Sequence, residues 1–409
     1  MSLQGKHILI GISGGIAAYK IPELIRMLVK NGAEVRVTTT RHALEFVTEL
    51  TLQTLSGHPV YSDVFAAINE HATEHISLPE WADMMLLAPA TANVLGKMAA
   101  GIADDALTTT LCSCAARKPI VIAPAMNDKM WECPATQQAI TSLSSWENVH
   151  ILEPEEGLLA CGTNGKGRMP EAATLQEAIE YALAPQDLTG RKVLITAGAT
   201  REGIDPVRFI SNYSTGKMGI ALAQECARRG AEVHLVCGTV SQAVLNPFGA
   251  IRYKETLSAQ SMYETCMETW PEADAAILCA AVADFTPVNE ADEKIKKQPG
   301  QTGLTLELRT TRDIAKALGE TKRAQQQLIG FALETQNEQA NALRKMQSKH
   351  LDAIVLNSLR DPGAGFGVDT NRVTILRCEA PAIELPLQSK ATIAAGIIDA
   401  TLAAHSNGN

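Results

Sequence analysis

Apolar and polar positions follow the same order twice along this chain. In the first occurrence, residues 6–11 (KHILIG) form a short apolar run rich in β-branched side chains, which predicts a buried strand, and Ser13-Gly14-Gly15 follows as a turn. Apolar side chains then recur at helical spacing between residues 21 and 28, Asn31-Gly32 is typical of a helix end, and residues 33–39 (AEVRVTT) predict the next strand. Strand, glycine turn, helix and strand in this order form a βαβ unit.

The second occurrence begins at residues 191–198 (RKVLITAG), which predict a strand. A Gly/Ser-rich loop leads to a helix that begins near Met218, Gly230 ends that helix, and residues 231–238 predict the next strand. Further buried strands are predicted at residues 82–93, 119–123, 273–284, 328–332 and 353–357. Continuous apolar strands that alternate with helices favour parallel sheets covered on both faces, so the predicted fold class is α/β with two Rossmann-like domains.

Length and composition agree with two ordinary globular domains. The chain has 409 residues, more than the roughly 250–300 at which one hydrophobic core stops growing. A polar, proline-containing stretch at residues 184–187 follows a predicted helix, so we expect domains at 1–186 and 187–409. The polar, glycine- or lysine-rich segments 157–171 and 287–303 are typical of lids or binding loops.

The net charge of −9 gives no support to a nucleic-acid or membrane-surface role, so no such partner is expected. Nine scattered cysteines, an odd number, do not indicate a disulfide framework. The N-terminal apolar run is too short for a signal peptide, and no apolar run reaches the ~18 residues of a membrane span. We therefore expect a cytoplasmic protein.

The turn Gly11-Ile12-Ser13-Gly14-Gly15 lies between a strand and a helix, where small residues let a phosphate approach backbone N–H groups. Hydroxyl groups of residues 38–40 (TTT) follow the next strand and could add donors. A full G-x-G-x-x-G is absent, and no acidic residue ends the second strand, which disfavours NAD. A mononucleotide such as FMN fits better.

Three segments and one histidine in the first half resemble the flavoprotein decarboxylases that act on peptidyl or pantothenoyl cysteines: residues 88–93 (APATAN), 124–131 (PAMNDKMW), 157–169 (GLLACGTNGKGRM), and His75. The resemblance implies a flavodoxin-like domain in which Asn127 binds substrate, His75 is the catalytic base and Cys161 is a proton donor on a flap. The residues it implies for FMN binding are Ser13, Gly14, Gly15, Thr39, Ala90, Thr91 and Ala92.

The chemistry explains these residue types. A thiol-bearing carboxylate cannot simply lose CO₂, because the resulting carbanion has nowhere to delocalise. If flavin first oxidises the carbon–sulfur bond to a thioaldehyde, the departing electrons can move onto sulfur, and a final reduction needs hydride and a proton. Cys161, in a glycine-rich loop, could close over the substrate and supply that proton.

In the second half, residues 198–219 (GATREGIDPVRFISNYSTGKMG) resemble the pattern of phosphopantothenate–cysteine ligases. This run predicts a long loop that ends at a helix N-terminus, where Ser214, Thr215 and Gly216 can offer hydrogen-bond donors to phosphates. A Walker-type P-loop is absent, because Met218 follows Lys217. The resemblance implies that Asn212 binds and activates an acyl intermediate and that Lys294 meets the triphosphate or the charge that develops in acyl transfer.

The same resemblance implies a set of nucleotide contacts on strand ends and on one later helix: Ala280, Ala281, Asp284, Asp313, Ile314, Phe331, Lys345 and Lys349. Lys345 and Lys349 are four residues apart, so they share a helix face. Mg²⁺ is expected to bridge the phosphates, with Asp284 as candidate ligand. Arg312 stands where the family often has proline, and Phe285 where it usually has tyrosine, which affects fine contacts of the nucleotide.

Both blocks in this order are typical of the bifunctional enzymes of coenzyme A biosynthesis. The resemblance implies that 4′-phosphopantothenate is joined to cysteine with CTP through an acyl-cytidylate, and that the product is decarboxylated with FMN to 4′-phosphopantetheine. It also implies a homo-oligomer, a dodecamer of decarboxylase trimers with flavin sites shared between subunits and paired ligase domains. Two alternatives stay open here: another flavin or NAD(P) oxidoreductase, and a non-catalytic flavoprotein subunit.

Overall fold

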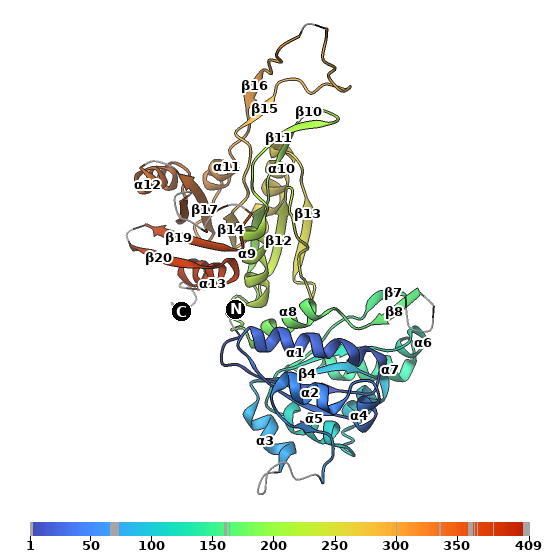
Figure 1. The fold of residues 1–409 in the computed structure, drawn as a ribbon. Helices are drawn as coiled ribbons and strands as arrows, with labels where there is room; N and C mark the ends of the chain where they lie inside the picture. The colour runs from blue at the N-terminus through green and yellow to red at the C-terminus, as the bar shows by residue number, and fades with distance from the viewer. Residues whose placement is uncertain are drawn as a thin grey trace. The chain divides into compact units, whose positions relative to one another are not determined.

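The computed structural model describes residues 3–65, 73–158, 162, 164–299, 301–334, 337–358, 363, 365, 367–378 and 380–403. They form two compact units (Figure 1). The N-terminal unit comprises Ser2–Ala184 with Leu245–Phe248, and the C-terminal unit comprises Pro185–Val244 with Gly249–Asn409. Each unit is described by itself below.

The N-terminal unit is built on a six-stranded parallel sheet of order β3-β2-β1-β4-β5-β6. Its strands are β1 (His7–Ile12), β2 (Glu34–Thr39), β3 (Val60–Tyr61), β4 (Met84–Ala90), β5 (Ile120–Pro124) and β6 (Val149–Ile151). Every residue of β4 is buried, as expected of a central strand covered on both faces. The order reverses direction between β1 and β4, and ligands of doubly wound sheets bind at the carboxyl ends of such strands.

Two hydrophobic clusters lie on the two faces of this sheet. The helices are α1 (Ile21–Lys30), α2 (Glu49–Ser56), α3 (Glu74–Trp81), α4 (Ala92–Ala100), α5 (Ala106–Ala115), α6 (Asp128–Trp131), α7 (Pro134–Ser144) and α8 (Ala172–Leu183), with 3₁₀ turns at Ile16–Lys20 and Arg41–Glu45. The predicted helical face is confirmed, because Ile21, Leu24, Ile25 and Leu28 are the buried residues of α1. The expected glycine-rich loop contains a small antiparallel pair, β7 (Glu155–Leu158) with β8 (Asn164–Arg168).

The C-terminal unit has an eight-stranded sheet of order β13-β12-β9-β14-β17-β18-β19-β20. Its strands are β9 (Lys192–Ala197), β12 (Glu232–Cys237), β13 (Ile251–Glu255), β14 (Ala275–Leu278), β17 (Gln327–Glu334), β18 (Ala353–Ser358), β19 (Thr370–Arg377) and β20 (Ala380–Ser389). The first six strands in the order are parallel, but β19 and β20 pair antiparallel. The prediction of purely parallel sheets is therefore incomplete here, and the α/β fold class is confirmed.

Helices cover this sheet, and a two-hairpin arm extends from it (Figure 1). The helices are α9 (Lys217–Arg228), α10 (Ala259–Thr269), α11 (Ile314–Glu320), α12 (Glu338–Ser348) and α13 (Lys390–Thr401), with a 3₁₀ turn at Trp270–Glu272. The arm consists of hairpin β10 (Arg201–Asp205) with β11 (Arg208–Ser211), and of β15 (Phe285–Pro287) with β16 (Leu308–Thr310) and the segment that joins them.

Two findings concern the protein as a whole. All cysteines in the described ranges are free thiols, as expected from their number and scatter. Within those same ranges, each helix is too short or too polar to traverse a lipid bilayer.

Candidate active sites

A cavity of about 730 Å³ opens at the carboxyl ends of β1, β4 and β5 in the N-terminal unit. It is lined by the predicted residues Gly14, Gly15, Thr91 and Asn127, together with apolar and cationic side chains from the neighbouring loops. These segments lie far apart in the sequence, and the parallel sheet brings them together because the carboxyl ends of its strands share one edge.

Ser13 ties the first two of these segments to each other. Its buried hydroxyl donates to the Pro89 carbonyl at 2.6 Å and accepts from the Thr91 amide at 3.0 Å. Ala90 and Ala92, the other two residues predicted here, end β4 and begin α4. Ser13 therefore holds the glycine turn against the start of α4, and in this structure its hydroxyl is hydrogen-bonded to backbone groups.

Buried hydroxyl groups next to this turn lack partners. The Oγ1 atoms of Thr38, Thr39 and Thr40 are buried and meet no hydrogen-bond partner within the part of the chain that the structure describes. Thr39 pairs with Ile12 in the sheet, directly before Ser13. Buried hydroxyls are normally hydrogen-bonded, so unmatched ones at the end of β2 fit a ligand with phosphate or carbonyl oxygens.

The glycine turn also shows why Gly14 is glycine. A Cβ atom there would lie 2.6 Å from His42 Cβ and 3.0 Å from the His42 carbonyl carbon. Because one of these is a backbone atom, a side chain at this position would push the turn away from the residues after β2.

The structure does not bring all predicted decarboxylase residues to the cavity. Asn127 lines it and caps α6, where its side-chain oxygen accepts from the Lys129 amide at 3.0 Å. His75 lies half-buried in the first turn of α3 and is not among the residues that line the cavity. Cys161 lies outside the described residues.

Two cavities of about 380 and 390 Å³ adjoin at the carboxyl ends of β9, β14 and β17 in the C-terminal unit. Both are lined by Ala280, Val282, Asp284 and Phe331, so they form one groove. One half holds the other predicted nucleotide contacts, Asp313, Ile314, Lys345 and Lys349. The other half holds Ala281, Asn212 and the predicted phosphate loop, residues 214–216.

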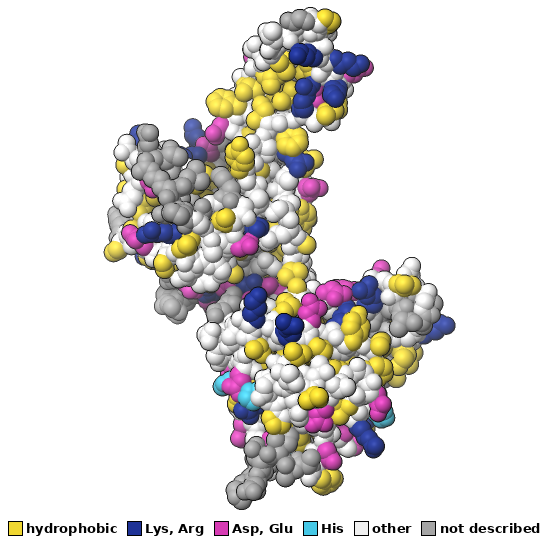
Figure 2. All heavy atoms as spheres, in the orientation of Figure 1, with side chains coloured by type: hydrophobic (Ala, Val, Ile, Leu, Met, Phe, Trp, Pro, Cys, Tyr) yellow, Lys and Arg dark blue, Asp and Glu magenta, His cyan; other side chains and the backbone are white. Residues whose placement is uncertain are grey.

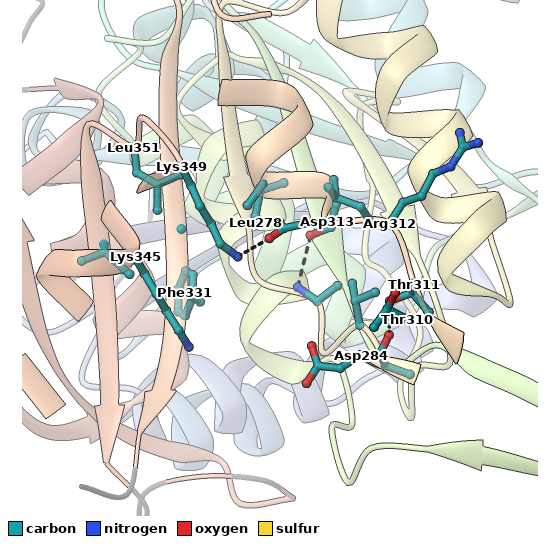
Figure 3. A pocket seen from close by; sticks show the side chains of 18 of the residues that line it. Leu278, Asp284, Thr310, Thr311, Arg312, Asp313, Phe331, Lys345, Lys349 and Leu351 are labelled. Atoms are coloured by element: carbon teal, nitrogen blue, oxygen red, sulfur yellow. Dashed lines mark hydrogen bonds and ion pairs between the residues drawn. The ribbon is translucent and has the colours of Figure 1, made fainter. Parts of the chain in front are cut away.

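An ion pair crosses the first half of the groove (Figure 3). Lys349 Nζ lies 2.8 Å from the Asp313 carboxylate, which also caps α11 by accepting from the Lys316 amide at 3.0 Å. Burial alone would raise the pKa of Asp313, but the hydrogen bonds from Lys349 and Lys316 outweigh it and lower the pKa. Arg312, whose position departs from the family pattern, lines this half of the groove, and its guanidinium carbon lies 5.1 Å from the centre of the Tyr263 ring. In Figure 3 the guanidinium is directed away from Asp313 and Lys349.

The second half of the groove is organised by backbone contacts. Asn212 Nδ2 donates to the Ala281 carbonyl at 3.0 Å, which joins the loop after β11 to the loop after β14. Thr196 Oγ1 accepts from the Ala280 amide at 3.2 Å and fixes the same loop to the end of β9. Burial raises the pKa of the Cys279 thiol beside them to about 12, which argues against that cysteine as a nucleophile.

Lys294 is the predicted ligase residue that lies away from the groove. It is exposed on the segment between β15 and β16, where Lys296 and Lys297 are exposed as well. Lys and Arg side chains gather near the end of this arm (Figure 2). No group of three or more potential metal ligands occurs among the described residues, and Asp284 lines both halves of the groove as an exposed carboxylate.

Comparison with known proteins decides the family. Residues 1–183 match the Flavoprotein family, and residues 188–404 match the family described as DNA/pantothenate metabolism flavoprotein C-terminal domain. The chain is 47% identical over 399 residues to the coenzyme A biosynthesis bifunctional protein CoaBC of Bacillus subtilis (strain 168), covering 97% of this chain and 96% of that protein. The chain belongs to the family of bifunctional coenzyme A biosynthesis proteins. The predicted pairing of a decarboxylase with a ligase is thus confirmed at the level of this family.

Two further relatives are similar to most of this chain. The CoaBC protein of Escherichia coli (strain K12) is 41% identical over 401 residues, covering 98% of this chain and 97% of its own. A cysteine/cysteine sulfinic acid decarboxylase from an unknown prokaryotic organism is 49% identical over 358 residues, covering 86% of this chain and 98% of its own. Neither an NAD(P) oxidoreductase nor a non-catalytic subunit gains support from these relatives.

Two lysines at the sites of this bifunctional protein were not predicted from the sequence. Lys20 lines the N-terminal cavity, and its Nζ donates to the Met169 carbonyl at 3.0 Å and to Glu171 at 2.7 Å. Lys390 lines the groove, and its Nζ donates to the carbonyls of Gly365 at 3.2 Å and Val368. A single lysine whose partners are distant in sequence leaves no signal, although Lys20 ends the 3₁₀ turn that follows the glycine turn.

Proposed function

We propose that this chain makes 4′-phosphopantetheine from 4′-phosphopantothenate, cysteine and CTP in two reactions. Residues 187–409 carry the ligase and residues 1–186 the decarboxylase, each at the carboxyl ends of the parallel strands of its own sheet. The observation that carries the proposal is that each unit has a cavity lined by the motif residues of one activity. Family membership gives the pairing of the two activities.

In the ligase reaction, the carboxylate of 4′-phosphopantothenate attacks the α-phosphate of CTP and pyrophosphate leaves. The cysteine amine then attacks the acyl-cytidylate and displaces CMP. Residues 214–216 offer donors to phosphate at the start of α9, and Lys345 and Lys349 present cations across the groove. Asn212 lines the same half of the groove as residues 214–216, where it can orient the acyl group. Asp284, whose carboxylate lines both halves of the groove, would help to hold Mg²⁺, and the cation would neutralise phosphate charge there.

In the decarboxylase reaction, the N-terminal cavity takes FMN and the cysteinyl end of the substrate. Thr91 at the start of α4 lines this cavity, and the threonine hydroxyls at the end of β2, which meet no partner among the described residues, lie next to the glycine turn. Both features suit a flavin mononucleotide. Bound FMN supplies a two-electron oxidation that makes loss of CO₂ possible, and later returns hydride. Asn127 positions the substrate carboxylate from the cavity wall, and Cys161 donates the last proton.

His75 needs a second copy of the chain under this proposal. The histidine is not among the residues that line the cavity of its own copy, and the family resemblance implies shared flavin sites. The protein is therefore a homo-oligomer, a dodecamer by that resemblance. Co-expressing His75→Asn with Asn127→Asp tests this. Decarboxylation that returns in mixed particles supports a shared site, whereas mixtures as inactive as the parents contradict it.

The free cysteines suit a reducing compartment, which supports a cytoplasmic location. The first experiment records the visible spectrum of the purified chain and incubates it with 4′-phosphopantothenate, cysteine, Mg²⁺ and CTP, with ATP as control. Mass spectrometry should find CMP, pyrophosphate, CO₂ and 4′-phosphopantetheine from a yellow protein.

Free cysteine and cysteine sulfinic acid serve as alternative substrates in that experiment, because a relative at 49% identity is named for them. Turnover of these two, with no ligation by either nucleotide, would overturn the proposal. A colourless protein that stops at the cysteine adduct would leave the ligase alone.

A further inference from the structure

The segment that carries Lys294 packs against the β10–β11 hairpin through residues that precede Lys294 and through the residue that follows it. The Ala291 amide donates to the Ile204 carbonyl at 3.0 Å. Glu290 packs against Gly203 so closely that a Cβ atom at Gly203 would lie 2.1 Å from the Glu290 carboxylate. This part of the arm is therefore held in place, although its lysines are exposed.

The carboxylate of Asp205, the last residue of β10, is the centre of this contact. It is fully buried and accepts the amides of Val207 and Arg208, each at 2.9 Å, which closes the hairpin turn. The Arg208 guanidinium binds it through Nε at 3.0 Å and through a second nitrogen. The Ile295 amide, from the residue directly after Lys294, donates to the same carboxylate at 3.1 Å.

Arg208 completes the attachment from the other direction. Its Nη2 donates to the Ile295 carbonyl at 2.8 Å, so both backbone groups of Ile295 are bound by the Asp205–Arg208 pair. A residue fixed at its N–H and its C=O has little freedom in its backbone orientation. The Cα of Lys294, one residue before, is therefore fixed as well.

We propose that Asp205 is a positioning residue of the ligase reaction. It holds the backbone of Lys294 in the orientation from which the lysine ammonium reaches the nucleotide phosphates. The proposal rests on the ligase function proposed above. Asp205 touches no substrate in this assignment and acts through Ile295. In the sequence, Asp205 belongs to the ligase-like run of residues 198–219 but was given no role of its own.

The electrostatics of the pair suit such a role. The Arg208 guanidinium, followed by the amides of Val207, Ile295 and Arg208 itself, holds the pKa of Asp205 well below its usual range. The carboxylate is therefore ionised wherever the enzyme works. Its charge-assisted hydrogen bonds are also shorter and stronger than neutral ones, and the two bonds from the guanidinium add geometric specificity. A carboxamide in the same place keeps the shape, loses the charge, and turns one acceptor into a donor that faces the Ile295 amide or the guanidinium.

A double-mutant cycle separates positioning from general stability. Asp205→Asn should lower the rate of CMP release about 10- to 100-fold, the effect of misplacing a reacting group by about 1 Å. Lys294→Gln should also slow ligation. The double variant should be no slower than Lys294→Gln alone, because Asp205 then has no lysine left to position. Hydrogen exchange of the peptide that contains Ile295 should rise in Asp205→Asn.

Asp187→Asn is the matched control, because Asp187 accepts from buried Arg229 at 2.8 Å elsewhere in the C-terminal unit. It should leave ligation near the wild-type rate, and all variants should decarboxylate supplied substrate normally. A wild-type chain that fails to ligate defeats the proposed function. Ligation at full rate in Asp205→Asn or in Lys294→Gln, or equal slowing by Asp205→Asn with and without Lys294, overturns the positioning role.

Discussion

Replacing Gly219 with alanine tests how closely α9 must approach the sheet for the ligase groove to form. Gly219 lies in the first turn of α9. A Cβ atom there would lie 2.5 Å from Ala197 Cβ, 3.0 Å from Ala197 Cα and 3.1 Å from the Thr196 carbonyl oxygen. Ordinary carbon–carbon contacts are about 3.5–4.0 Å, so roughly 1 Å is missing.

Two opposing effects set the size of the change. Alanine favours a helix interior over glycine by about 0.5–1 kcal/mol, which would stabilise the variant. Overpacking a closely packed site costs about 1–3 kcal/mol. Two of the three contacts are backbone atoms of β9, a strand paired with β12 on one side and β14 on the other, so it cannot give way easily. We therefore take the upper end of the cost and expect a net loss of about 2 kcal/mol.

That loss should appear as a fall of about 4–8 °C in the melting temperature of the C-terminal unit. The groove should suffer too, because Lys217, Met218 and Gly219 line it and the Thr196 hydroxyl holds the Ala280 amide. The KM for CTP should rise several-fold, while decarboxylation of supplied substrate stays unchanged.

The assay is thermal unfolding followed by circular dichroism, with both activities measured on the same samples. Gly303→Ala is the control, because its added Cβ would meet no atom within 4 Å in the same unit. It should change stability by no more than about 0.5 kcal/mol. If Gly219→Ala melts at the wild-type temperature and binds CTP normally, α9 does not need glycine to reach β9, and the reasoning is wrong.

Three further predictions concern single residues. Cys161→Ser should release CO₂ but accumulate the oxidised enethiol, seen by mass spectrometry as a product lighter by one hydrogen molecule; full reduction would count against the proton-donor role. Asn212→Asp should set a carboxylate oxygen against the Ala281 carbonyl in place of a 3.0 Å hydrogen bond, and slow ligation about tenfold or more without touching decarboxylation. Asp187→Asn should destabilise the C-terminal unit by about 2 kcal/mol at neutral pH in urea unfolding. The hydrogen bond from Arg229 lowers the Asp187 pKa, so this contribution is fully present above the unfolded pKa of about 3.9 and is lost as the pH falls through the folded pKa; a difference that stayed constant to pH 2 would contradict it.

Central strands were predictable because both of their faces are buried. The strand Met84–Ala90 is apolar at every position and buried at every position, so no alternation hides it. The antiparallel strands β19 and β20 gave no such signal. In β20 only a minority of side chains are even half-buried, and its place at the edge depends on pairing with β19. Such edge pairing depends on tertiary contacts, which the local pattern of apolar and polar residues does not predict.

The candidate sites divide in the same way. Binding residues such as Thr91, Asn127 and Ala280 stand at strand ends or helix starts, and sheet topology fixes those places once the strands are known. Lys20 and Asp205 depend on partners about 150 and 90 residues away, which only the folded chain shows.

His75 and Lys294 show a third situation, in which the residue type is readable but the place of action is not. Each stands on a segment outside the sheet of its unit, α3 in one case and the arm in the other, and neither is among the residues that line the cavity that its motif implies. A group that approaches substrate from outside the sheet edge must be delivered by a second copy or by a segment held at a defined angle. The rate then depends on whatever holds that segment, which is why an aspartate that touches no substrate can matter to ligation as much as the lysine it positions.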